Sequence, residues 1–451
     1  MHRREFLTAL AAIGLPTHDS APAPQAWQAG VATIDITPEN SLWMAGFAAR
    51  TQASQGVALP LHAKALALKS GKEPTAVLVT VDLLGLTART TDHVAAAVRR
   101  RHRIRREDVL FNASHTHCGP VVDEQLSVAY DLSLAQWEDI RAYTTRLEDK
   151  LVTVISEAIG RLGPAQVSYS RDEAAFAANR RVRFTPLGPV DHTVQVLRVD
   201  GSNGSPVAIV FGYACHNTTL PATFVRYHGD YAGVAQALVE QRHPGATALF
   251  VAGCGADANP MPRGTIELVE AHGTALADAV DRALKTSSPI APSLRTAYGR
   301  VDLPFASDAD REQWRSHLDI DRVYLQRHAA LMKSAIDRDG RLPRAQPDPV
   351  QVWQFGSKAG TNQKTDLTLV ALGGEVVVDY ALRLAREFPQ RRMWTAGYSN
   401  DVFAYVPSLR VLKEGGYEGG DAMIYYGRPG PFADNVEDLI IRKVRGLLEG
   451  R

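Results

Sequence analysis

Runs of apolar residues divide the chain into segments typical of strands. Residues 29–40, AGVATIDITPEN, alternate between apolar and polar positions and stop at a proline, as a half-buried strand does. Other runs are apolar at almost every position, which is typical of strands buried on both faces. These runs are TAVLVTVDLLGL at 75–86, PVAIVFGYACH at 206–216 and TALFVAGCGAD at 247–257.

Between these runs, apolar residues recur every three to four positions, which is the period of an amphipathic helix. Residues 133–162 keep this period over many turns, and residues 90–103 and 230–244 are shorter examples. Because strands and helices alternate along the chain, we predict an α/β fold with a mixed, buried sheet and flanking helices.

A highly charged helical segment, residues 308–338, interrupts this alternation. The proline-containing stretch LPRAQPDP at 342–349 follows it and is interpreted as a linker. We therefore predict a helical insertion or lid near residues 306–349, within a single domain that spans residues 27–451.

The first residues have the pattern of a targeting segment. MHRREFLTALAAIGLP carries a twin arginine, Arg3 and Arg4, ahead of a short apolar run, and small residues follow near Ala21. This pattern is typical of a twin-arginine export signal. We predict that residues 1–25 are a signal peptide and that the protein is exported to the periplasm or the cell exterior. The apolar run is too short to span a bilayer, and no later segment is a plausible transmembrane span.

The global charge argues against one class of partner. The chain has 50 basic and 49 acidic residues, so its formal net charge is only +1. Such a balance gives no long-range attraction for nucleic acid or an anionic membrane. A basic cluster at residues 99–106 is interpreted as the C-terminus of a helix, where positive side chains complement the helix dipole.

Polar residues gather where four of the predicted strands end, which is where α/β proteins usually hold their sites. The four segments are NASHTHCGP with His115 and His117, ACHNTTLP with His216, GCGADANP with Asp257 and Asn259, and LGGEVVVDY with Glu375. We expect them to form one site.

The His115–His117 spacing by itself predicts a metal-binding pair. In a strand, residues two apart point to the same face, so both imidazoles could bind one zinc ion. His216 and Glu375 could then complete the ligand set. The three cysteines offer another possibility, as thiolate ligands or a nucleophile, although buried cysteines are commonly small packing residues. A Cys215–Cys254 disulfide is also possible after export.

The ordered motifs resemble the N-terminal catalytic domain of the neutral/alkaline non-lysosomal ceramidases. The resemblance rests on seven segments that occur in the same order: GVATIDITP, ASHTHCGP, AANRR, ACHNT, GCGADANP, LGGE and GYSNDVFAYVPSLRVLKEGGYEGG. YHGDYAG at 227–233 is more similar to bacterial relatives of the ceramidases than to the ceramidases themselves. The resemblance thus indicates an exported bacterial relative.

The resemblance implies one catalytic zinc ion per chain. Its implied ligands are His115, His216, Glu375 and Tyr405, which leaves His117 beside the reacting carbonyl as a catalytic residue. Arg180 and Tyr417 are similar to the substrate-contacting arginine and second tyrosine of the family, with Arg181 as the alternative arginine. Further candidates for substrate contacts or support of the site are Asp230, Asp257, Asn259 and Asn400.

The chain departs from the ceramidase pattern in two places. Asn259 stands where the family loop carries a serine, so a mechanism that needs that hydroxyl is excluded. The chain also ends soon after the tyrosine-rich segment, so we expect it to lack the C-terminal β-sandwich domain of the ceramidases.

These observations predict a zinc-dependent hydrolase that cleaves an amide bond in an N-acyl, lipid-like substrate by zinc-activated water. The first alternative is a zinc esterase or lactonase that acts on a non-lipid substrate. The second is a non-catalytic, metal-containing binding protein. A two-metal phosphoesterase or sulfatase would need a second set of ligands, for which Asp230 and Asp257 are the only spare carboxylates in the motifs.

Overall fold

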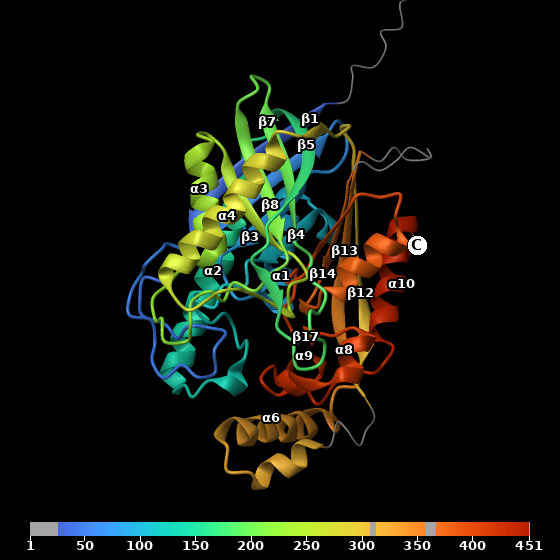
Figure 1. Ribbon diagram of the computed structural model, residues 1–451. Helices are drawn as coiled ribbons and strands as arrows, with labels where there is room; N and C mark the ends of the chain where they lie inside the picture. Colours follow the sequence, from blue (N-terminus) through green and yellow to red (C-terminus); the bar gives the residue numbers. More distant parts are fainter. Residues whose placement is uncertain (1–25, 307–312, 357–366, 451) are drawn as a thin grey trace, which may run out of the picture.

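The computed structural model describes residues 26–306, 313–356 and 367–450. The predicted signal peptide, residues 1–25, therefore lies outside the described residues. The fold is built around two sheets that pack against each other (Figure 1). This architecture confirms the predicted α/β fold with flanking helices.

The larger sheet follows the strand order β4-β3-β2-β1-β5-β7-β8-β9, with β11 paired to β5. Neighbouring strands are antiparallel except for the pairs β3–β4 and β8–β9, which are parallel. Asn112 of β4 exchanges hydrogen bonds with Ala252 of β9, so the two ends of this strand order come side by side. The strands are β1 (Trp27–Asp35), β2 (His62–Ser70), β3 (Ala76–Val81), β4 (Val109–Ala113), β5 (Gly163–Glu173), β7 (Thr193–Gly201), β8 (Pro206–Tyr213), β9 (Thr247–Ala252) and β11 (Ser288–Pro289).

The smaller sheet follows the order β12-β13-β14-β16, and two short two-stranded sheets lie beside the site. Large aromatic residues such as Trp27, Trp353 and Trp394 fill the layer between the two main sheets. The strands are β12 (Leu294–Pro304), β13 (Ala345–Phe355), β14 (Leu367–Leu372) and β16 (Met393–Ala396), with the short pairs β6 (Ala177–Asn179)–β10 (Ala258–Pro260) and β15 (Glu375–Val376)–β17 (Tyr405–Val406).

Helices cover the outer faces of both sheets, so the layers run helix, sheet, sheet, helix. Helices α1 to α4 bury their apolar faces on the larger sheet, and α7 and α10 cover the smaller one. The helices are α1 (Ala88–His102), α2 (Leu134–Gly160), α3 (Asp230–Arg242), α4 (Ile266–Leu284), α6 (Val323–Asp339), α7 (Asp379–Glu387), α8 (Leu409–Glu414), α9 (Gly416–Gly419) and α10 (Val436–Glu449).

The longest helix shows how local sequence sets an element's limits. Ser133 accepts a hydrogen bond from the Gln136 backbone N–H, and the Gln136 side chain binds the Ser133 backbone in return. This reciprocal capping box satisfies N–H groups that would otherwise lack partners at the start of α2. Leu147, Leu151 and Val154 then repeat at helical spacing and are fully buried against the larger sheet.

The predicted insertion is present, but its boundaries differ from the prediction. β12 pairs with β13 along its whole length, from Leu294–Phe355 to Pro304–Ala345. The stretch interpreted as a linker is therefore partly the start of β13. Pro347 and Pro349 lie in this part of the strand, although proline has no backbone N–H to donate and for that reason usually argues against a strand. The insertion, with η3 (Gln313–Asp319) and α6, projects from the end of this strand pair (Figure 1).

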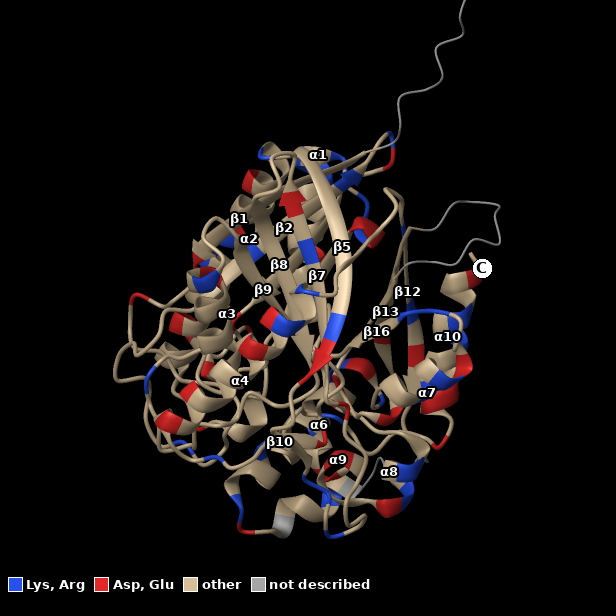
Figure 2. Ribbon diagram, turned by 45° about the horizontal axis from the view of Figure 1, so that its top comes forward, with Lys and Arg blue, Asp and Glu red and all other residues tan. Residues whose placement is uncertain are grey.

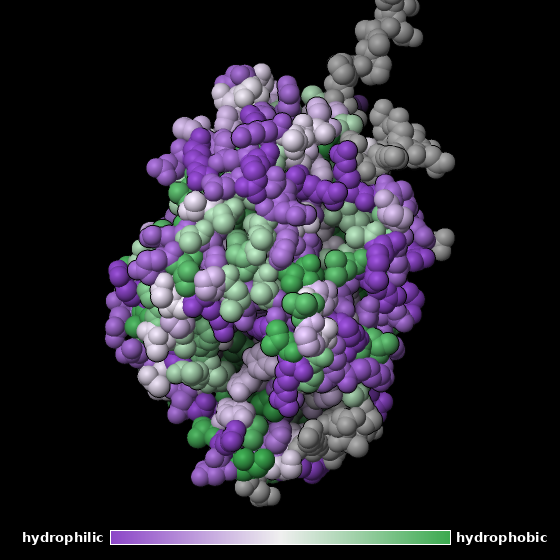
Figure 3. Space-filling view, viewed as in Figure 1, coloured by the Kyte–Doolittle hydropathy of each residue, from purple (hydrophilic) through white to green (hydrophobic). Residues whose placement is uncertain are grey.

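Charge and apolar surface are both distributed over the molecule. Lys and Arg residues are interspersed with Asp and Glu on the helices around the sheets (Figure 2). The face shown in Figure 3 is a mosaic of hydrophilic and hydrophobic residues. Within the described residues, none of the helices combines the length and apolar character that crossing a membrane requires.

Candidate metal centre

The two histidine segments are held together by backbone pairing. Thr116 and Asn217 form an isolated parallel bridge, and the His117 N–H donates to the Asn217 carbonyl at 3.3 Å. The Asn217 side chain also donates to the Ser114 carbonyl. These contacts place the loop that follows β4 against the loop that follows β8.

His115 and His117 do not lie in a strand. The expectation that strand geometry points both imidazoles to the same face is therefore wrong. β4 ends at Ala113, and His115 adopts a left-handed backbone conformation with φ of 62°. Such a conformation is rare for a residue with a side chain and is common at functional sites. The two imidazoles still face each other, with their Nε2 atoms 3.3 Å apart, because the chain turns between them.

Two of the histidines have their Nε2 atoms prepared as metal ligands. His115 Nδ1 lies 2.7 Å from the Leu84 carbonyl, and His216 Nδ1 lies 2.9 Å from the Gly255 carbonyl. A carbonyl can only accept, so each Nδ1 carries the proton and each Nε2 presents a lone pair. A metal-bound histidine usually donates its other ring N–H to a carbonyl or carboxylate in this way, which fixes the orientation of the ring. Burial, followed by the nearby charge of Arg180, lowers the pKa of His216 to about 4, so it is neutral near pH 7.

Glu375 and Tyr405 come from the small sheet β15–β17, where they are direct register partners. The Glu375 N–H donates to the Ala404 carbonyl at 2.8 Å, which holds the two segments in parallel. Strand partners on neighbouring strands point to the same face of the sheet. Glu375 and Tyr405 therefore reach the same point from segments 30 residues apart in the sequence.

The four predicted ligands converge on one point. Glu375 Oε2 lies 3.1 Å from Nε2 of both His115 and His216, and the Tyr405 hydroxyl lies 3.3 Å from His216 Nε2. Donor atoms bound at about 2.0–2.1 Å around one tetrahedral zinc ion lie about 3.3 Å from one another. Both Nε2 atoms carry a lone pair and no proton, so neither can donate to Glu375. The buried Glu375 Oε2 therefore has no hydrogen-bond partner. The donors and their spacing therefore fit a zinc ion.

His117 differs from the other two histidines. Its Nε2, with those of His115 and His216, belongs to a buried group whose ligand atoms lie within 4.8 Å of one another. However, its Nδ1 has no hydrogen-bond partner, so nothing fixes the ring as a carbonyl fixes His115. Burial, followed by the proximity of the other two histidines, lowers the pKa of His117 well below its usual range. The geometry permits a role as ligand or as a neighbour of the reacting carbonyl.

Arg180 and Tyr417 line the same cavity as His117, of about 460 Å³. Arg180 donates to the Tyr405 hydroxyl at 3.0 Å and forms an ion pair with Glu418 at 2.6 Å. The Tyr417 ring packs edge-on against Tyr405, with ring centroids 5.3 Å apart. The structure therefore brings both predicted substrate-contacting residues against Tyr405, one of the predicted ligands.

Arg181, the alternative arginine, also lines this cavity, but its guanidinium is occupied by Glu414 at 3.0 Å and Glu418 at 2.5 Å. Asn259 lies on the same wall, and its Oδ1 accepts from Arg180 at 3.4 Å. Of Arg180 and Arg181, Arg180 is therefore the one with a described hydrogen bond to a predicted ligand, Tyr405.

Three further predicted residues support the loops rather than line the cavity. Asp257 accepts from the Val378 N–H and from Asn179, each at 3.0 Å. Asp230 accepts from the Leu220 N–H at 3.0 Å and from the Tyr231 N–H at 2.7 Å. Asn400 contacts the side chains of Arg106 and Gln351. Their polar atoms are committed to these contacts, so the expectation of substrate contact is not supported for them.

Several residues that contact the predicted ligands and Arg180 were not predicted from the sequence. The Tyr426 hydroxyl donates to Glu375 Oε1, and Glu418 neutralises Arg180. The rings of Phe47 and Tyr398 pack against His117 and His115, with centroids 4.6 and 4.3 Å apart. None of these residues stands beside a histidine in the sequence. The two tyrosines and the glutamate fall in or near the tyrosine-rich segment, which was the only available signal.

All three cysteines are buried free thiols. The possible Cys215–Cys254 disulfide is therefore not formed. Burial raises the pKa of the Cys118 thiol to about 12 and that of Cys215 well above its usual range, so neither is a reactive thiolate near pH 7. This agrees with the interpretation of the cysteines as small packing residues.

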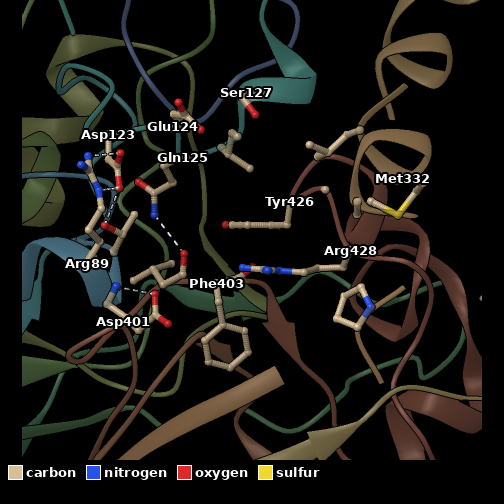
Figure 4. Close-up of a pocket in the computed structure, with 18 of the residues that line it drawn as sticks. Arg89, Asp123, Glu124, Gln125, Ser127, Met332, Asp401, Phe403, Tyr426 and Arg428 are labelled. Carbon is tan, nitrogen blue, oxygen red and sulfur yellow. Dashed lines mark hydrogen bonds and ion pairs between the residues drawn. The ribbon is translucent and has the colours of Figure 1, made fainter. Parts of the chain in front are cut away.

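A larger cavity, of about 840 Å³, lies between α6 and the body of the protein (Figure 4). None of the predicted ligands or catalytic residues lines it. Tyr426 stands on its wall, and the Tyr426 hydroxyl reaches Glu375, so this cavity adjoins the predicted ligand set. Asp401 and Arg428 lie on the same wall.

Asp401 gives the stability of the protein a predicted pH dependence. Burial raises its pKa to about 6, and the carboxyl accepts a hydrogen bond from the Ala88 N–H at 3.0 Å. Because the folded pKa lies above the unfolded value, the stabilisation is complete below about pH 4 and is lost as the pH rises through 6. Asp401→Asn keeps a side-chain oxygen that can accept from the Ala88 N–H but cannot ionise. We expect it to remove up to about 3 kcal/mol of the loss in the free energy of unfolding at higher pH.

Urea unfolding at pH values from about 4 to about 7.5 tests this expectation. The wild-type free energy of unfolding should fall with pH more steeply than that of Asp401→Asn. Groups other than Asp401 titrate in both proteins, so the difference between the two curves isolates this carboxyl. Parallel curves would show that Asp401 is ionised normally in the folded state.

Comparison with known proteins gives a family match over the first part of the chain. The family model "Neutral/alkaline non-lysosomal ceramidase, N-terminal" matches residues 27–260, a range that contains His115, His117, Arg180 and His216. Glu375, Tyr405 and Tyr417 lie beyond the match. The search of the curated proteins gave no match.

Solved ceramidase structures have the same fold. Neutral ceramidase from Pseudomonas aeruginosa matches with a TM-score of 0.72 and 16% sequence identity, over 94% of this chain and 74% of that chain. A ceramidase complexed with C2 matches with the same TM-score and identity, over 94% of this chain and 76% of that chain. Together with the family match over more than half of the sequence, these findings mean that the chain belongs to the neutral/alkaline non-lysosomal ceramidase family.

Proposed function

We propose that this protein is a zinc-dependent hydrolase that cleaves the amide bond of an N-acyl, lipid-like substrate. Membership of the ceramidase family supports an amide-bond hydrolase. The observation that carries the zinc assignment is the position of Glu375 Oε2, buried and 3.1 Å from the unprotonated Nε2 atoms of His115 and His216. A carboxylate facing two lone pairs is unfavourable unless a cation lies between them.

We propose His115, His216, Glu375 and Tyr405 as the residues that hold the metal. When bound there, zinc would lower the pKa of a water molecule to about 7 and polarise the substrate carbonyl. The Tyr405 hydroxyl is oriented by Arg180, and burial, the largest influence, raises the pKa of this phenol well above its usual range. A phenol that keeps its proton binds a metal weakly, so Tyr405 is the weakest of the four proposed metal ligands.

The other residues of the cavity act on the substrate itself. Arg180 is fixed by Glu418 and Tyr405, so its guanidinium is already in place to donate hydrogen bonds to the oxygen of the attacked carbonyl. Tyr417 can donate from its hydroxyl to the same oxygen. The lowered pKa of His117 leaves its imidazole neutral, so one ring N–H can donate to the developing negative charge and the other nitrogen can accept a proton.

Asn259 restricts the mechanism. Its amide accepts from Arg180 and from the Thr218 hydroxyl at 3.4 Å and is not a nucleophile. The lining of the cavity includes Thr218, but its hydroxyl is engaged with Asn259 rather than with a histidine. Attack by water, rather than by a side-chain hydroxyl, is therefore the route that these residues favour.

The same donors would also act on an ester or lactone, because those carbonyls develop the same oxyanion. A non-catalytic binding protein is the other alternative, and the serine-to-asparagine departure at Asn259 is its main support. We also propose that the protein is exported to the periplasm or cell exterior, on the basis of the twin arginine and the apolar run within residues 1–25.

The first experiment is native purification of the mature chain with measurement of bound metal, followed by assay on N-acyl amides, esters and lactones of matched acyl length. We expect about one equivalent of zinc and the highest kcat/KM on the amides. Zinc below about half an equivalent would contradict the metal assignment. Zinc without turnover of any substrate would favour the binding protein, and preference for esters or lactones would favour the first alternative.

A further inference from the structure

Four arginines and one acidic residue, Glu418, line the cavity that holds His117. Arg180 and Arg181 are satisfied there, because Glu418 forms an ion pair with both and Glu414 adds a second pair with Arg181. These contacts neutralise the inner part of the cavity wall. The remaining lining arginines are Arg183 and Arg263.

Arg183 and Arg263 are exposed, and neither has a carboxylate partner within ion-pair distance among the described residues. They come from different parts of the chain: Arg183 follows β6, and Arg263 follows β10, the strand that pairs with β6. Because these two short strands are antiparallel, the segments that follow them leave opposite ends of the pair, and both unpaired positive charges lie on the lining of one cavity. A cavity of this kind raises the local concentration of anions at its mouth.

Aromatic surface lies beside these charges. Phe184 and Tyr417 are 38% and 45% exposed, although both are large aromatic residues on the cavity wall. The Arg183 guanidinium lies 5.7 Å from the centre of the Phe184 ring. The wall thus offers apolar surface to an acyl chain and two cationic groups to a polar portion of the same molecule.

We propose that the substrate carries an anionic oxygen group, a carboxylate or a sulfonate or phosphate, on the amine portion of the amide, and that Arg183 and Arg263 recognise it. This proposal rests on the proposed amidase function and narrows its substrate class. A fully uncharged polar portion would leave both guanidiniums without a partner. The acyl chain is assigned to the aromatic wall, since its apolar carbons gain from contact with Phe184 and Tyr417.

Three octanoyl amides test the proposal: N-octanoylglycine with a carboxylate, N-octanoyltaurine with a sulfonate, and N-octanoylethanolamine without charge. Their short acyl chain keeps them monomeric, so binding to a lipid surface cannot produce a difference. Exposed ion pairs are individually weak, and two acting on one group should raise kcat/KM for an anionic substrate about tenfold over the neutral one. The preference should shrink between about 0.05 M and about 0.5 M salt.

Arg183→Gln combined with Arg263→Gln should abolish this preference while leaving kcat/KM for N-octanoylethanolamine unchanged. Arg100→Gln, on the exposed last turn of α1, removes one positive charge far from β6 and β10 and should change neither value. A preference for either anion that depends on both arginines supports the proposal, and the favoured anion identifies its chemistry. Equal kcat/KM on all three substrates, or a preference that survives in the double variant, would overturn it.

Binding separates this proposal from the proposed function. Calorimetric titration with the same three amides measures anion preference without requiring turnover. Tighter binding of an anionic amide in the absence of hydrolysis would support the role of the two arginines and contradict the amidase function. Hydrolysis of the neutral amide with no anion preference in either measurement would support the amidase and overturn the arginine assignment.

Discussion

Replacing His115 by alanine is expected to abolish zinc binding. His115 supplies one of the two Nε2 atoms that face Glu375 Oε2 at 3.1 Å, and the Leu84 carbonyl fixes its tautomer for this purpose. Loss of a supporting contact alone typically costs about 10–100-fold in metal affinity, and loss of the ligand itself should cost at least the upper value. Zinc content after native purification should fall from about one equivalent to a small fraction.

Thermal unfolding gives an independent measure of the same loss. A ligand at about 100 times its Kd stabilises the folded state by about 2.7 kcal/mol, so added zinc should raise the Tm of the wild type. The Tm of His115→Ala should not respond. His93→Ala serves as the control, because His93 is an exposed residue of α1 remote from the cluster. Retention of one tightly bound zinc in His115→Ala would contradict the ligand assignment.

Much of the fold could be predicted because burial imposes a simple pattern on the sequence. β3, β8 and β9 lie on the larger sheet between a helical layer and the second sheet, so nearly every position is apolar. The start of β13 could not be predicted from its prolines, because pairing with β12 on one side decides its structure. Contacts between distant segments outweigh local propensity at such places.

The candidate site could be predicted from the sequence where two chemically distinctive residues stand close together in the chain. His115, His117 and His216 stand at strand ends, which is where an α/β fold gathers its polar groups. The turn at His115 was not predictable, because its left-handed φ of 62° occurs at a residue other than glycine. Tyr426 and Glu418 were missed because each reaches the site through tertiary contacts, to Glu375 and Arg180, that leave no local pattern.

The roles of His115 and His117 can be separated by experiment, because the two side chains make different contacts. Leu84 orients His115, whereas His117 Nδ1 has no partner, and Glu375 and Tyr405 already complete four donors without His117. We therefore expect His117→Ala to retain about one equivalent of zinc. Its kcat should fall by about 10²–10⁴-fold, the range for loss of a proton-transfer group or an oxyanion donor.

His117→Gln distinguishes these two forms of catalysis. A glutamine amide can donate a hydrogen bond to an oxyanion but cannot accept and return a proton near neutral pH. Recovery of most of the lost kcat in His117→Gln would assign His117 as a hydrogen-bond donor, and activity as low as that of His117→Ala would assign proton transfer. If His117→Ala instead loses zinc as completely as His115→Ala, His117 is a ligand, and the three clustered imidazoles bind the metal together.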